Sequence, residues 1–139
     1  MSFSPLLAAG PVISLHAFAA MAAFVLGVIQ FAMPKGTGLH RITGYIWCAL
    51  MITIALSSFW ISTLRVWGWF SPIHLISVFV LLVIPYGIYR ARTGHIEGHR
   101  KSMTYTFFGA LIVAGAFTLL PNRVMHEVVF GSAPALHQK

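Results

Sequence analysis

The sequence predicts an all-α membrane protein, a single domain over residues 1–139 that folds as an up-down bundle of four transmembrane helices. Hydrophobic residues make up 58% of the chain and charged residues only 8%, whereas soluble domains carry about a quarter charged residues. The chain also contains four stretches without Asp, Glu, Lys or Arg, each long enough for the roughly 20 residues that a helix needs to cross a bilayer. These stretches are residues 1–34, 42–64, 66–89 and 102–122.

The four helices are expected at residues 11–33, 39–63, 72–91 and 98–120, and a short C-terminal tail over residues 121–139 follows them. The third helix has a clear start, because Ser71 can cap it and Pro72 suits its first position. The first helix is expected to remain in the protein, because its apolar stretch lacks the preceding Lys or Arg of a cleavable signal peptide.

Positive charge predicts the orientation in the membrane. Cytoplasmic loops carry an excess of Lys and Arg, and with four spans most of the cations fall on one side of the bilayer. Both termini are therefore expected on the opposite, periplasmic side. Because the cations stand at helix ends rather than on one polar face, nucleic-acid binding is not expected. The cations on the cytoplasmic side are Lys35, Arg41, Arg90, Arg92, Arg100 and Lys101.

Four histidines form two pairs at matching depths. His40 and His99 each begin a helix on the cytoplasmic side, and His16 and His74 lie near the outer ends of the first and third helices. The interval from His16 to His74 nearly equals the interval from His40 to His99, as a duplicated helical hairpin would leave it. In an up-down bundle the first and third helices are diagonal neighbours, as are the second and fourth. Each diagonal is therefore expected to carry a histidine pair at one end.

Two imidazoles that face each other across a bundle core are the axial ligands that a b-type haem requires. We therefore predict one or two b haems, with the iron bound by His16 and His74 near the outer face and by His40 and His99 near the inner face. Haem propionates are anionic and would pair with cations at the helix ends. The candidate partners are Arg41, Arg100 and Arg123.

The first helix offers a face on which a flat macrocycle could lie. Ala20, Ala23 and Gly27 stack with His16 at helical spacing and leave that face nearly bare of side chains. A stripe of small residues also lets helices pack closely in lipid without any ligand, and arginines at helix ends also reach towards headgroups. Gln30 is expected to bond to a neighbouring helix or the inner interface rather than to a ligand.

Counts of reactive residues exclude several kinds of chemistry. Cys48 is the only cysteine, which excludes an intramolecular disulfide and a site built from several cysteines. Glu97 and Glu127 are the only acids, and they lie on opposite sides of the bilayer, so hydrolysis by paired carboxylates is excluded. No catalytic side chain is predicted. Arg123, His126 and Glu127 form either a substrate site at the outer face or the plain end of the last helix.

Four stretches, KGTGLHRITGYIW, FSPIHL, HRKSM and TLLPNR, resemble the pattern of a prokaryotic family of small predicted four-helix membrane proteins of unknown function, over about residues 12–123. This resemblance implies a bacterial inner-membrane protein. The histidine layout is also similar to that of di-haem transmembrane cytochromes b of the b561 kind and to the half-repeat of haem A synthase. That likeness implies axial-ligand roles for His16, His40, His74 and His99, although three of them stand very near helix ends.

These observations predict a transmembrane cytochrome b that transfers electrons between the two membrane faces, with quinol, superoxide or a partner subunit as donor or acceptor. Two alternatives remain open. One is a cofactor-free accessory subunit that packs against a respiratory or photosynthetic membrane complex. The other is a metal- or haem-handling protein in which His16, His74 and His126 bind copper or zinc at the outer face.

Overall fold

The structure is a computed structural model that describes residues 4–61, 72–119 and 124–130, and within these ranges it is helical without strands. The prediction of an all-α protein is therefore confirmed. In chain order the elements are α1 Ser4–Ala8, α2 Pro11–Ala32, α3 Gly38–Ser58, α4 Pro72–Arg92, α5 Ile96–Tyr105, the π-helix η1 Thr106–Ile112, α6 Val113–Thr118 and α7 Val124–Phe130.

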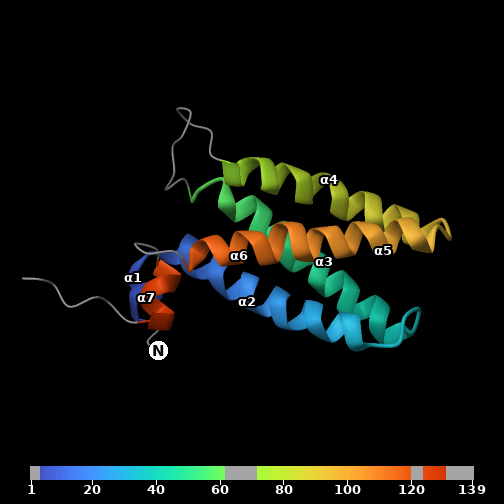
Figure 1. Cartoon of the computed structure of the whole chain (residues 1–139), viewed down its shortest axis with the longest axis horizontal. Helices are drawn as coiled ribbons and strands as arrows, with labels where there is room; N and C mark the ends of the chain where they lie inside the picture. The colour runs from blue at the N-terminus through green and yellow to red at the C-terminus, as the bar shows by residue number, and fades with distance from the viewer. Residues whose placement is uncertain (1–3, 62–71, 120–123, 131–139) are drawn as a thin grey trace, which may run out of the picture.

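The long helices lie side by side as an elongated stack (Figure 1). Helix α2 packs on α3, α3 packs on α4, α4 packs on α5 and η1, and η1 returns to α2. Among the described residues, three helices are long and apolar enough to cross a membrane: Pro11–Ala32, Gly38–Ser58 and His74–Arg92. They correspond to the first three predicted helices.

The fourth predicted helix, residues 98–120, corresponds to a run of three segments. Helices α5 and α6 are joined through η1 without a gap, so the helical run covers residues 96–118. A π-helix carries more residues per turn than an α-helix, so side chains before and after η1 do not follow one regular stripe. Simple periodicity could not predict this change of register.

The end of α3 differs from the predicted one. Helix α3 ends at Ser58 rather than at residue 63, and Phe59, Trp60 and Ile61 continue with tight backbone hydrogen bonds to Leu56, Ser57 and Ser58. The predicted cap Ser71 lies outside the described residues.

Two short helices that the sequence did not indicate pack together beside the start of α2. Helices α1 and α7 bury Leu6 and Val128 against Ala17, with Ile13 and Met21 around them. The predicted tail thus contains helix α7. Helices of five and seven residues are too short to show a helical period, and it is this packing that stabilises them.

The main core lies between the long helices, and its large buried side chains come from α3, α4 and η1, whereas α2 contributes Ala23. Trp47, Met51, Ile84 and Phe107 are nearly fully buried there. Many apolar side chains on the outside remain exposed, for example Leu82 at 68%. An apolar exterior of this kind is what a helix bundle presents to lipid.

Candidate functional site

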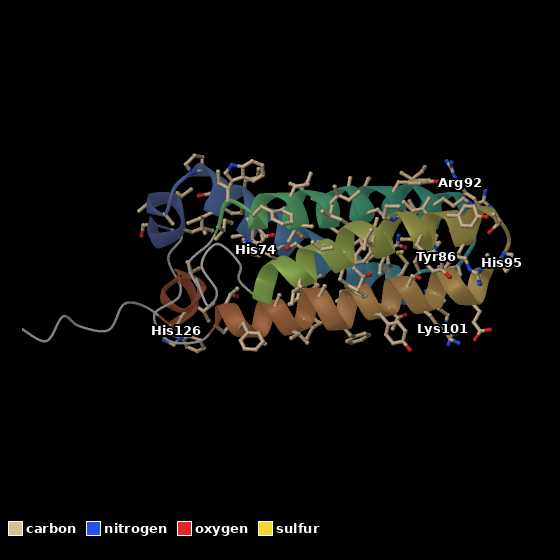
Figure 2. The ribbon with its side chains drawn as sticks, turned by 90° about the horizontal axis from the view of Figure 1, so that it is seen from above. His74, Tyr86, Arg92, His95, Lys101 and His126 are labelled. Atoms are coloured by element: carbon tan, nitrogen blue, oxygen red, sulfur yellow. The ribbon has the colours of Figure 1, made fainter. Side chains whose placement is uncertain are left out.

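The histidines in the described ranges fall at the two ends of the stack. The two short turns at residues 33–37 and 93–95 lie at one end, with the cations Lys35, Arg41, Arg90, Arg92, Arg100 and Lys101 around them. We call this the cationic end, and the other the opposite end. Figure 2 shows Arg92, His95 and Lys101 at the cationic end and His74 and His126 at the opposite end.

At the opposite end, the His16 ring on α2 contacts the last turn of α3. Its Nδ1 lies 2.8 Å from the Ser57 hydroxyl oxygen. The Ser57 hydroxyl donates its hydrogen to the Ile54 carbonyl at 3.1 Å, so it is left to accept from His16. The geometry therefore favours the tautomer of His16 with hydrogen on Nδ1 and a free lone pair on Nε2.

His74, on α4, meets the same turn of α3 from the other side. The imidazole is buried, with 5% of the residue exposed, and it stacks on the Phe59 ring with the two centroids 5.3 Å apart and nearly parallel. One turn further along α4, the Ser77 hydroxyl hydrogen-bonds to the Ser58 hydroxyl. Residues 57–59 thus contact both α2 and α4, and His16 and His74 both lie against this short segment.

At the cationic end, His40 lies in the first turn of α3. Its backbone N–H donates to the Thr37 hydroxyl, which caps the helix, at 3.1 Å, and its carbonyl accepts from the Gln30 side-chain amide at 3.0 Å. The expectation that Gln30 bonds to a neighbouring helix is confirmed. The His40 Nδ1 and the Gln30 Oε1 are both buried and have no hydrogen-bond partner in the described part of the chain.

His99, on α5, completes this cluster. Its Nδ1 lies 3.0 Å from the Gly87 carbonyl oxygen of α4, and because a carbonyl only accepts, Nδ1 must carry the hydrogen. The cationic end therefore brings together side chains from α2, α3 and α5 and a backbone carbonyl from α4.

The small-residue stripe on α2 is occupied by protein side chains. The Trp47 indole N–H donates to the Ala23 carbonyl at 2.9 Å. A methyl group placed on Gly27 would stand 2.4 Å from the Phe107 ring. The expectation that a flat macrocycle could lie along this stripe is wrong at Ala23 and Gly27, because two aromatic side chains of the bundle already cover it.

The structure describes two of the three arginines that were predicted to pair with haem propionates. Arg41 and Arg100 are exposed in the first turns of α3 and α5, beside His40 and His99 in sequence. Arg123 lies outside the described residues, so its predicted role at the opposite end stays a prediction.

The predicted outer metal set does not form a cluster. Within the described ranges, no group of three or more His, Cys, Asp or Glu side chains lies close enough to hold a metal ion. The Nδ1 of His126 hydrogen-bonds to the Leu119 carbonyl at 2.8 Å, and its ring packs on Phe130. His126 is thus bound to the end of the last helical run, and the structure shows no grouping of it with His16 and His74.

Several residues of these clusters were missed from the sequence. Ser57 and Ser58 form an adjacent polar pair at the end of an apolar run, which is a signal that could have been read. Gly87 contributes only a backbone carbonyl, and the sequence carries no signal for that contact.

In the described residues the protein is all-helical, and several of its helices are long and apolar enough to cross a membrane. Residues 13–135 match the family model described as predicted membrane protein (DUF2306), and the chain belongs to this family. The resemblance to a family of predicted membrane proteins is thereby confirmed, whereas no comparison shows the likeness to cytochrome b561. Neither a curated protein nor a solved structure matches the chain.

Proposed function

We propose that this protein is a four-span cytochrome b of the bacterial inner membrane, with both termini in the periplasm, that binds one or two b haems and passes electrons across the bilayer. The run of residues 96–118, at about 1.5 Å per residue, is long enough to serve as the fourth span. The six cations at one end support a cytoplasmic position for that end.

One observation carries the haem assignment. At each end of the stack, one imidazole has its Nδ1 hydrogen-bonded to an acceptor on a neighbouring helix: His16 to the Ser57 hydroxyl and His99 to the Gly87 carbonyl. Histidines that bind metals through Nε2 almost always donate Nδ1–H in this way, because the hydrogen bond fixes the tautomer and the ring orientation.

The residues at the two ends fit a haem better than the middle does. Each end supplies two imidazoles from different helices, and the His40 Nδ1 has no hydrogen bond that a turn of the ring towards a ligand would break. At the middle, Trp47 and Phe107 fill the bundle. We therefore assign any haem to the two ends, with Arg41 and Arg100 as propionate partners at the cationic end and Arg123 at the other.

A bound b haem supplies a one-electron Fe(III)/Fe(II) couple. The chain's own residues do the rest: His16 and His74, or His40 and His99, hold the group, and Ser57 and Gly87 orient one ring of each pair. Trp47 and Phe107 keep water out of the space between the two ends. A quinol or another membrane subunit is the partner that this arrangement suits.

The first test is an optical spectrum of the purified protein, oxidised and then reduced with dithionite, with a pyridine haemochrome assay for stoichiometry. One or two haems per chain are expected. If there are two, His40→Ala and His16→Ala should each remove about half of the bound haem. The control is His95→Ala, which changes an exposed histidine in the turn between α4 and α5.

A colourless protein from cells with ample haem would contradict the cytochrome proposal. A correctly folded but colourless protein that copurifies with a larger complex would indicate the accessory-subunit alternative instead. Metal that is bound without haem, and that is lost in His16→Ala but kept in His40→Ala, would indicate the outer metal site.

A further inference from the structure

Two hollows lie on the outside of the molecule, both between α4 and the run formed by α5 and η1. Their volumes are about 480 and 470 Å³, and Phe79 and Tyr105 line both of them. The first extends to Leu75 and Gly109, and the second extends to Arg90 at the cationic end. We call the whole the α4–α5 furrow.

The length and lining of the furrow suit a hydrocarbon chain. Between Leu75 and Arg90, α4 rises about 22 Å at 1.5 Å per residue, which exceeds the roughly 15 Å of one leaflet of a 30 Å hydrocarbon core. Leu75, Phe79 and Gly109 make the first hollow apolar. No side chain projects from Gly109, where a methyl group would meet no atom within 4 Å.

The end of the furrow nearest the turn at residues 93–95 carries a cation that is held in place. The Arg90 guanidinium lies against Gly98, since a methyl group on Gly98 would stand 2.5 Å from its Nε, and it sits 5.7 Å from the centroid of the Tyr86 ring. The Arg90 Nε is buried and has no hydrogen-bond partner in the described part of the chain. Figure 2 shows Tyr86, Arg92 and Lys101 towards the same end of the molecule.

Charge at this end favours an anion. Lys101 and Glu97 both line the second hollow, but they pair with each other at 2.7 Å and remain exposed. Arg90 is then left as the unbalanced charge of the hollow, because Glu97 is its only acidic lining residue. A partly buried arginine without a carboxylate partner is a strong site for a phosphate, which it can bind with two parallel hydrogen bonds.

We propose that the α4–α5 furrow binds one anionic phospholipid, with its phosphate on the Arg90 guanidinium and an acyl chain along Phe79 towards Gly109. Basic hollows between membrane helices are recognised sites for anionic headgroups. A neutral quinone tail would fill the apolar part equally well, but it would leave the Arg90 charge unmatched. The furrow contains none of the four histidines, so this proposal stands apart from the haem assignment.

The test compares two lipids with identical acyl chains, phosphatidylglycerol and phosphatidylcholine, added to the detergent-purified full-length protein and measured by native mass spectrometry. Phosphatidylglycerol should bind about tenfold more tightly. Arg90→Gln should reduce this preference to less than about twofold. Arg92→Gln removes an equal charge from an exposed position at the end of α4 that does not line the furrow, and it should leave the preference unchanged.

Two further variants separate the parts of the site. Gly98→Ala keeps the charge but displaces the guanidinium, and should weaken phosphatidylglycerol binding by about threefold. Gly109→Leu fills the apolar hollow, and should weaken binding of the long-chain lipid while leaving a dihexanoyl analogue unaffected. Thermal unfolding of each variant without lipid checks that it is folded.

Three outcomes would overturn the proposal. Equal binding of the two lipids would remove the argument from charge. An equal loss of preference in Arg90→Gln and Arg92→Gln would show that the preference comes only from the general positive charge of this end. Competition by millimolar inorganic phosphate together with no effect of Gly109→Leu would indicate a phosphate site without a role for the furrow.

Discussion

The two ends of the molecule hold their histidines by different means. At the opposite end, His16 is held by a side-chain hydroxyl, that of Ser57. At the cationic end, His99 is held by the backbone carbonyl of Gly87. A side chain can be removed by one substitution, whereas a carbonyl cannot. The comparison teaches that the opposite end depends on residue identity, and the cationic end depends on how closely α4 and α5 approach.

The largest loss of stability is expected from a substitution in the core between the two ends, where Trp47 and Phe107 pack. Gly27→Leu places side-chain atoms where the Phe107 ring and the Trp47 indole already lie. Overpacking of a buried site should lower the free energy of unfolding by about 3 kcal/mol, measured by denaturant unfolding in micelles. Gly109→Ala is the control because its methyl group meets open space. Equal stability of the two variants would contradict the packing described for the middle.

The next effect should be confined to the opposite end. Ser57→Ala leaves the His16 Nδ1–H without its acceptor, which should cost about 2 kcal/mol of unfolding free energy. Nitrogen NMR of labelled histidine should show that His16 loses its Nδ1–H tautomer while His99 keeps it. Thr53→Ala removes a hydroxyl that bonds only within α3, and it should change neither signal. A matching change at His99 would show that the two ends are coupled.

A smaller effect is expected from Thr37→Ala at the cationic end. The substitution removes the cap of α3 and the acceptor of the His40 backbone N–H, and a lost cap costs about 1 kcal/mol. Faster amide hydrogen exchange should appear in the first turn of α3 and not in its last turn, beside Ser57. Exchange that rises along the whole helix would contradict a local role for the cap.

The smallest effect should come from the ion pair on α5. The Glu97 carboxylate pairs with the Lys101 ammonium at 2.7 Å. Both side chains are exposed, and exposed pairs contribute little. Glu97→Gln should leave thermal unfolding at pH 7 unchanged, and a clear loss would indicate that the pair is shielded from water.

The polar clusters could be anticipated only in part. The sequence pairs His16 with His74 and His40 with His99 by depth, and this pairing stays a prediction. In the structure His16 contacts Ser57 and His74 stacks on Phe59, whereas His99 bonds to the Gly87 carbonyl of α4. The contacts of Ser57 and Gly87 could not be predicted, because they depend on how two helices are rotated against each other. The bare face at Ala23 and Gly27 was misinterpreted for the same reason.

The sequence by itself determined the helices and their approximate ends, since a chain with long charge-free stretches must satisfy its backbone hydrogen bonds within each stretch when it enters lipid. It also determined that the cations gather at one end. Only the tertiary structure decided that Trp47 and Phe107 cover the stripe on α2, that α1 packs on α7, and that a π-helix interrupts the last run. Each of these depends on contacts between residues far apart in the chain, and these contacts leave no local pattern.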